Sequence, residues 1–117
     1  MTDKVYSFLG LATKARKLVS GEETCERALK GPGVSLIIVA DDASQNTKKK
    51  FIDACRFRSI EIRIFGKKDQ IGKFTGKNIR SVVAILDKGF SKRLMEMIDC
   101  SVNNGCGGEN IDENESI

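Results

Sequence analysis

The sequence predicts an α/β protein, a three-layer α/β/α sandwich around a mixed sheet of about four strands. Apolar runs typical of strands alternate along the chain with stretches of helical periodicity. Two of these runs, SLIIVA at 35–40 and SVVAIL at 81–86, contain no charged residue, as expected for strands covered on both faces. The length of 117 residues suits one domain, and no internal repeat is present.

The first half of the chain predicts two helices and two strands. Residues 3–17 carry apolar side chains at helical spacing with lysines and arginines mostly off that stripe, which indicates an amphipathic helix. A very short strand is expected at 18–19 and a second helix at 21–30. The segment GPG at 31–33 ends this helix, because glycine suits the C-terminal turn and proline blocks continuation. The run at 35–40 is then a buried strand.

The second half repeats the alternation. A helix capped by Asp42 or Ser44 is expected to run to about Phe57. IEIRIF at 60–65 alternates apolar and charged residues, so it predicts a strand with one wetter face, near a sheet edge. A short helix at 68–75, the buried strand at 81–86 and a final helix at 88–101 complete the domain. From residue 102 the chain is rich in Asn, Gly and Glu, and we expect a disordered tail over 102–117.

Charge is distributed unevenly along the chain. The net charge is +4, but the tail carries Glu109, Asp112, Glu113 and Glu115 and no basic residue. Residues 1–101 therefore hold 20 basic and 12 acidic side chains, a net charge of +8. A basic domain of this size suits a polyanion such as RNA. Lysines that only keep a small domain soluble are the alternative.

The composition argues against catalysis, metal binding and export. The chain has no histidine, which excludes Cys–His and Ser–His nucleophile pairs. Its four cysteines form no CxxC pair, so we expect no zinc site, no cofactor and no enzymatic activity. No run is long enough to span a membrane, and the N-terminus lacks the layout of a secretory signal. We therefore expect a cytoplasmic protein with reduced cysteines and no membrane partner.

The stretch SGEETCERALKG at 20–31 allows two interpretations. Ser20 and Glu23 have the spacing of a capping box, in which each side chain binds the other residue's amide. The start of the same helix also offers free amides to a phosphate, and Gly21 allows nucleic acid to approach the backbone closely.

Two longer stretches resemble a known family. GLATKARKLVSGEETCERALKGPGVSLIIVADDAS at 10–44 and IFGKKDQIGKFTGKNIRSVVAIL at 64–86 are similar to the ribosomal protein L7Ae and L30e family of kink-turn RNA-binding proteins. The likeness covers about residues 5–100 and is closest to the small bacterial YlxQ-type members. It implies an L30e-like sandwich that binds RNA without catalysing a reaction.

The resemblance also implies an RNA-binding face. Its residues would lie at the start of the second helix and in the loop before the last strand: Gly21, Glu23, Thr24, Arg27, Lys77, Asn78, Ile79 and Arg80. In this interpretation Gly21 permits close approach, Arg27 donates to a phosphate or base, and Ile79 packs against an unstacked base. The family's Asn–Glu pair is replaced here by Glu23 and Thr24, which indicates an altered base preference.

We expect residues 1–101 to form a monomeric, ribosome-associated or translation-linked domain that binds rRNA or another structured RNA. The alternative is a protein–protein adaptor that keeps the fold and has lost RNA binding. The glutamates at the expected RNA face favour this alternative, because carboxylates repel phosphates.

Overall fold

The computed structural model describes residues 2–103, which form five helices and four strands. Their order confirms the predicted alternation: α1 (Thr2–Lys14), β1 (Leu18–Ser20), α2 (Glu22–Lys30), β2 (Leu36–Val39), α3 (Gln45–Arg58), β3 (Glu61–Ile64), α4 (Lys68–Phe74), β4 (Val82–Ile85) and α5 (Lys88–Asn103).

The four strands form one mixed sheet in the order β1-β4-β2-β3. β4 runs antiparallel to both of its neighbours, whereas β2 and β3 are parallel. Every residue of the two central strands is buried, while β3 at the edge is exposed or half-buried, as its alternating sequence predicts. The chain therefore places its two uncharged runs, at 35–40 and 81–86, in the middle of the sheet.

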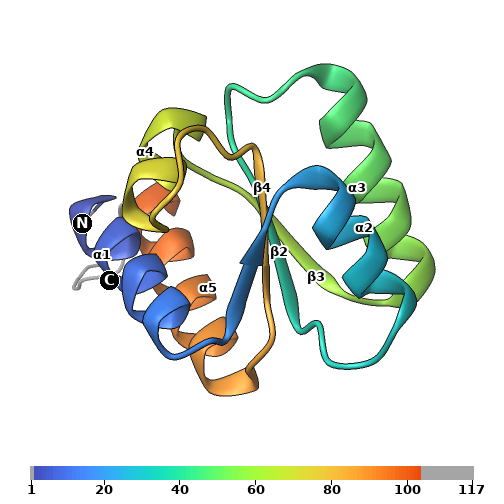
Figure 1. The fold of residues 1–117 in the computed structure, drawn as a ribbon, viewed down its shortest axis with the longest axis horizontal. Coiled ribbons are helices and arrows are strands. Elements are labelled where there is room, and N and C mark those ends of the chain that lie inside the picture. The colour runs from blue at the N-terminus through green and yellow to red at the C-terminus, as the bar shows by residue number, and fades with distance from the viewer. Residues whose placement is uncertain (1, 104–117) are drawn as a thin grey trace.

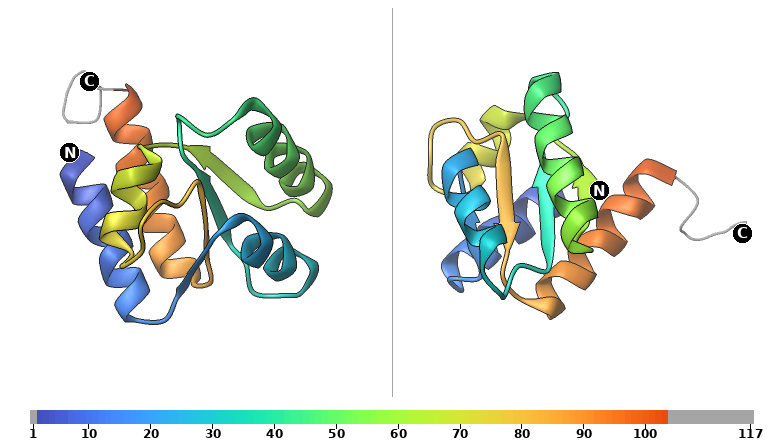
Figure 2. Two further views of the ribbon diagram at one scale, coloured as in Figure 1. Left: turned by 45° about the horizontal axis from the view of Figure 1, so that its top comes forward. Right: turned by 90° about the vertical axis from the view of Figure 1, so that its right-hand side faces the viewer.

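Helices cover both faces of the sheet, so the predicted three-layer sandwich is confirmed. α1, α4 and α5 lie on one face, and α2 and α3 lie on the other (Figures 1 and 2). Fully buried side chains fill the space between the layers, among them Leu9 of α1, Phe51 of α3 and Leu94 of α5. Burial of each such side chain contributes about 1.5–3 kcal/mol to stability, so packing against the sheet fixes the helix positions.

Two helix ends differ from the sequence prediction. α1 ends at Lys14 rather than 17, because Arg16 adopts a left-handed conformation with φ 61° and the Lys17 amide returns to the Ala12 carbonyl at 2.9 Å. α5 continues to Asn103, two residues beyond the predicted end. The predicted disordered tail at 102–117 is therefore wrong at residues 102 and 103, which belong to this helix, and its remainder from residue 104 lies outside the described residues.

The cysteines follow the sequence prediction only in part. Cys25 and Cys55 are buried free thiols. Burial raises the pKa of Cys25 to about 12 and that of Cys55 to about 11, so both stay protonated at neutral pH. Cys100 is disulfide-bonded, and the prediction of a reduced thiol is wrong for this residue. Cys106 lies outside the described residues.

Candidate nucleic-acid interface

Two segments far apart in the sequence meet at one end of the sheet. β1 leads into α2 there, and the loop between α4 and β4 returns beside it (Figure 1). The Gly21 amide donates to the Val82 carbonyl at 2.9 Å, and Ser20 pairs with Val83 across the β1–β4 ladder. We call the surface made by residues 21–27 and 75–81 the candidate edge. Strand pairing in the sheet therefore brings the two segments of the candidate edge together.

The start of α2 lacks the predicted capping box. Gly21 is the N-cap residue, with φ 102°, and no side chain accepts from the first helical amides. Ser20 belongs to β1, and its hydroxyl accepts a hydrogen bond from Arg80 Nε at 3.1 Å instead. The capping prediction is wrong because strand pairing holds Ser20 outside the helix. The first amides of α2 therefore have no side-chain acceptor in the described chain, an arrangement that suits an anion.

Gly21 is needed for its backbone conformation rather than for space. Its positive φ is one that L side chains rarely adopt. A Cβ built there would lie 3.9 Å from both Arg80 Nε and Thr24 Oγ1, an ordinary contact distance. Gly21, Thr24 and Arg80 are thus neighbours.

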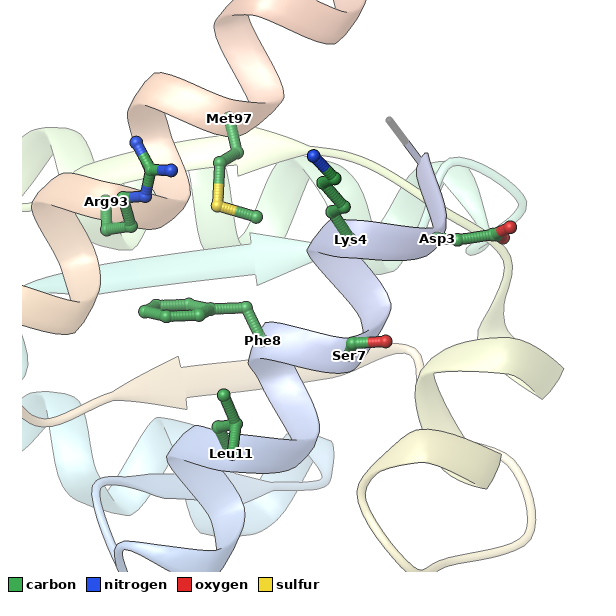
Figure 3. A pocket seen from close by; sticks show the side chains of 7 residues that line it. All are labelled: Asp3, Lys4, Ser7, Phe8, Leu11, Arg93 and Met97. Carbon is green, nitrogen blue, oxygen red and sulfur yellow. The ribbon is translucent and has the colours of Figure 1, made fainter.

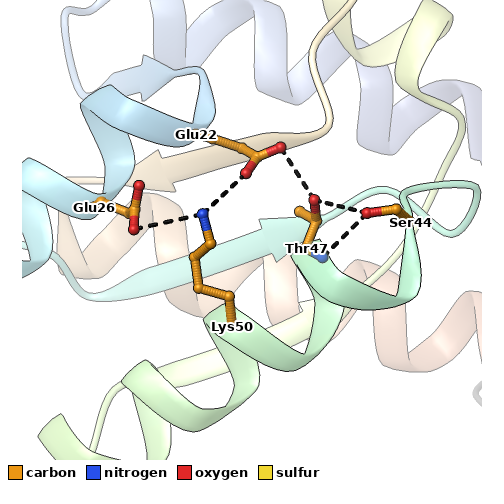
Figure 4. Close-up of polar contacts among 5 residues, drawn as sticks. All are labelled: Glu22, Glu26, Ser44, Thr47 and Lys50. Carbon is orange, nitrogen blue, oxygen red and sulfur yellow. Dashed lines mark hydrogen bonds and ion pairs between the residues drawn. The ribbon is translucent and has the colours of Figure 1, made fainter.

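The two glutamates at the start of α2 have different surroundings. Glu22 turns toward α3, where its carboxylate accepts from Thr47 Oγ1 at 3.0 Å and from Lys50 Nζ at 3.2 Å (Figure 4). The hydrogen bond that Lys50 donates to Glu22 raises the pKa of Lys50. Lys50 also approaches Glu26 at 3.5 Å. Glu22 is therefore partly neutralised by α3, which leaves Glu23 as the exposed carboxylate in the first turn.

Glu23 and Arg27 lie one helical turn apart on the outer face of α2. Both are exposed, and together with Glu26 and Lys30 they line a shallow depression. Within the described chain neither Glu23 nor Arg27 takes part in an ion pair. The Arg27 guanidinium therefore keeps its five donors for a ligand.

The α4–β4 loop is held by its backbone. The Lys77 amide donates to the Gly72 carbonyl at 2.7 Å, and the buried Thr75 hydroxyl donates to the Ile71 carbonyl at 2.8 Å. Gly72 lies directly under the loop: a Cβ there would overlap the Asn78 carbonyl oxygen and lie 2.9 Å from the Ile79 nitrogen. With the loop backbone packed against Gly72, the side chains of Lys77, Asn78 and Ile79 are exposed, and Ile79 has 55% of its surface accessible.

Arg80 links the two segments. Its Nε donates to Ser20, its Nη1 donates to the Ile79 carbonyl at 2.9 Å, and its amide donates to the Lys68 carbonyl at 3.0 Å. The side chain is half-buried, so it positions the loop against β1 more than it projects outward. Among the predicted site residues, Arg80 has the strongest structural role.

The structure thus brings all eight predicted residues to one end of the molecule, and three further residues support them. Sequence reasoning took Ser20 for a cap and gave no role to Gly72 or Thr47. A glycine inside the short helix 68–75 is the one local signal of close backbone approach. Ser20 contacts a residue 60 positions away in the sequence and Thr47 contacts one 25 positions away, so no local sequence pattern predicts either contact.

A pocket lies on the opposite face of the sheet, between α1 and α5. Phe8 and Met97 project into the gap between these helices, beside the exposed Leu11, and Lys4 and Arg93 lie close to them (Figure 3). In residues 2–103 no three His, Cys, Asp or Glu side chains gather as metal ligands would. No helix over the same range has the length and apolar character needed to cross a membrane.

Comparison with known proteins identifies the family to which the chain belongs. The model of the ribosomal protein L7Ae/L30e/S12e/Gadd45 family matches residues 3–95. RNA-binding protein YlxQ of Bacillus subtilis (strain 168) is 35% identical over 94 residues, which cover 80% of this chain and 94% of that protein. RNA-binding protein YlxQ of Enterococcus faecium is 34% identical over 96 residues, 82% of this chain and 92% of that protein.

Two solved structures share the fold. A protein of unknown function from Bacillus halodurans C superposes with a TM-score of 0.79 at 40% identity, over 82% of this chain and 97% of that one. The Giardia lamblia 15.5kD RNA binding protein superposes with a TM-score of 0.68 at 15% identity, over 85% of this chain and 84% of that one. At this second level of identity the likeness establishes the fold alone.

Proposed function

Because the chain belongs to the ribosomal protein L7Ae/L30e/S12e/Gadd45 family, we propose that it is a noncatalytic RNA-binding protein that holds structured RNA at the candidate edge. One observation carries the proposal. The Arg80–Ser20 hydrogen bond joins the start of α2 to the α4–β4 loop, and this joined surface presents uncapped helix amides beside exposed polar and apolar side chains. The names of the two YlxQ relatives support the same class of ligand.

Each exposed residue of the candidate edge suits a different part of an RNA. The first amides of α2, together with Lys77, suit phosphate oxygens. Arg27 offers a planar, bidentate donor to a phosphate or a guanine edge. Asn78 can both donate and accept at a base edge, and Ile79 offers an apolar surface to an unstacked base. Arg80 acts mainly by positioning this loop.

The RNA we propose is a kink-turn-like element or another bent segment of rRNA. Thr24 and Glu23 stand where the family pattern has Glu and Asn. A hydroxyl and a displaced carboxylate change the hydrogen bonds available to base edges, so we expect a base preference that differs from that of standard kink-turn binders. The protein then acts in the cytoplasm as a monomer, in association with the ribosome or with translation.

Fluorescence anisotropy with two labelled RNAs tests the proposal. One RNA carries a kink-turn, and the other is a random-sequence duplex of the same length and charge. We expect the kink-turn RNA to bind at least tenfold more tightly at a common salt concentration. Both log affinities should fall with log salt by about 0.7–0.9 per neutralised phosphate. Equal affinities across the salt series would exclude specific recognition of the kink-turn.

A protein–protein adaptor is the second candidate, favoured by the exposed and unpaired Glu23 at the candidate edge. The two functions separate in a pull-down from lysate with and without nuclease. An RNA-binding protein loses its RNA-bridged partners after nuclease, whereas an adaptor keeps them.

A further inference from the structure

The end of α3 carries a second feature that the candidate edge does not use. Phe57 is 84% exposed, the most exposed large apolar side chain in the described chain. It lies in the last turn of α3 between Arg56 and Arg58. The Arg58 guanidinium lies 5.8 Å from the centre of the Phe57 ring, at a cation–π distance. A single exposed aromatic side chain is common on protein surfaces, so the charged groups around Phe57 decide whether it suits a ligand.

The charges around Phe57 are uncompensated. Two acidic residues lie close to it in the sequence, but each already has a basic partner: Asp53 pairs with Lys49 at 3.1 Å and Glu61 with Arg63 at 3.2 Å. Arg56 and Arg58 are exposed and have no ion pair within residues 2–103. The Arg58 guanidinium therefore lies over one side of the exposed Phe57 ring, and a second exposed arginine, Arg56, precedes the ring in the sequence.

The surroundings favour RNA over protein as the occupant. A protein hot spot is an aromatic side chain inside a larger apolar area that excludes water. The other two exposed large apolar side chains lie elsewhere, Leu11 beside the α1–α5 pocket and Ile79 in the candidate edge. An isolated ring between arginines instead matches sites where a base stacks on an aromatic side chain while basic groups hold the adjoining phosphates.

The position of Phe57 separates it from the candidate edge. α3 begins at the end of the sheet where the candidate edge lies and runs to the opposite end (Figure 1). Its 14 residues span about 20 Å, so one RNA chain can reach from one end to the other.

We propose that Phe57, Arg56 and Arg58 form a stacking site for an unpaired base of single-stranded RNA, with the arginines on its flanking phosphates. This inference rests on the proposed RNA-binding function and adds a second contact at the far end of α3. The site tolerates any base, because every base offers a stacking face.

Anisotropy with a labelled decauridylate at low salt tests the site. Phe57→Ala should weaken binding about fivefold or more, the effect expected for loss of one stacked base. Phe57→Trp should retain the affinity of the unsubstituted chain. Leu11→Ala removes another exposed apolar side chain, at a distance from the site, and should change nothing. Arg56→Gln and Arg58→Gln should each reduce the slope of log affinity against log salt by about the contribution of one neutralised phosphate.

Three results would overturn the proposal: Phe57→Ala within twofold of the unsubstituted chain, Phe57→Trp as weak as Phe57→Ala, or an equal loss with Leu11→Ala. Loss of a protein ligand without loss of decauridylate would assign Phe57 to a protein interface instead. The kink-turn RNA distinguishes this failure from failure of the proposed function. If the protein prefers the kink-turn RNA to the duplex and Phe57→Ala does not change decauridylate binding, the proposed function stands and only the stacking site is wrong.

Discussion

The two halves of the candidate edge are built in different ways. The start of α2 is held by side chains, because Glu22 reaches Thr47 and Lys50 of α3 and Ser20 accepts from Arg80. The α4–β4 loop is held mainly by its backbone, which rests on Gly72 and is closed by the Lys77 amide.

This difference separates the shape of the edge from its charge. A larger residue at position 72 would clash with the backbone of the loop. Because a backbone segment cannot move aside as a flexible side chain can, the whole loop would shift. A substitution on α2 changes one charge or one hydrogen bond and leaves the backbone in place. We therefore expect large, joint losses of stability and affinity from the loop half and smaller, separable losses from the α2 half.

The largest effect is expected from Gly72→Ala. The new Cβ would overlap the Asn78 carbonyl oxygen and lie 2.7 Å from its carbon, so the loop must shift as a whole. We expect the free energy of unfolding to fall by about 2–3 kcal/mol and the affinity for kink-turn RNA to fall more than tenfold. Urea unfolding and anisotropy below the melting temperature measure the two quantities. Gly31→Ala is the control, because its Cβ meets nothing closer than 3.9 Å.

Arg27→Ala comes next and should reduce affinity without loss of stability. Its exposed guanidinium has no ion pair in the described chain, so removal costs only the contact with RNA, roughly tenfold in affinity. Lys49→Ala is the matched control: Lys49 is also exposed, but it pairs with Asp53 on α3 and should change affinity less than twofold. Equal losses for both variants would contradict the placement of the RNA at the candidate edge.

Ser44→Ala should show how far α2 depends on α3. The Ser44 hydroxyl caps α3 by accepting from the Thr47 amide at 3.1 Å, and Thr47 in turn donates to Glu22. We expect the free energy of unfolding to fall by about 1 kcal/mol, with less than a threefold change in affinity. Ser7→Ala, on the exposed side of α1, should stay within about 0.5 kcal/mol of the unsubstituted chain. A large affinity loss with Ser44→Ala would mean that α3 orients the RNA contacts of α2.

The smallest effect at neutral pH concerns Cys25, which anchors α2 against the sheet. Its pKa is raised to about 12 by burial, so above about pH 8.5 the unfolded chain loses a proton that the folded chain keeps. The Cys25 contribution to the free energy of unfolding should therefore be constant below that pH and fall by up to about 1.4 kcal/mol per pH unit above it. Cys55, whose pKa burial raises to about 11, adds a similar slope, so Cys25→Ala should remove about half of the total. Urea titrations at pH 8, 9 and 10 measure the slope. A Cys25→Ala variant with the same slope would assign the loss to other groups.

The sequence predicted the elements well because their signals are local. The uncharged run 81–86 and the alternating run 60–65 each identify a strand and its place in the sheet without reference to the rest of the chain. The family resemblance then brought the two candidate segments together. The capping box failed because Ser20 pairs with Val83 and binds Arg80, and neither contact leaves a pattern near Ser20. The requirement for glycine at position 72 was missed because it arises only from the contact between Gly72 and the Asn78 backbone in the folded chain.

The β1–β4 ladder also has a consequence for when the candidate edge can form during synthesis, because it pairs an early strand with a late one. β1 is an edge strand whose neighbour in the sheet is β4, the last strand to be synthesised. A nascent chain that has reached only β3 contains the residues of α2 but has no partner for β1 and no loop beside Gly21. The candidate edge is therefore complete only after β4 has emerged, so the RNA binding that we propose there requires nearly the whole domain.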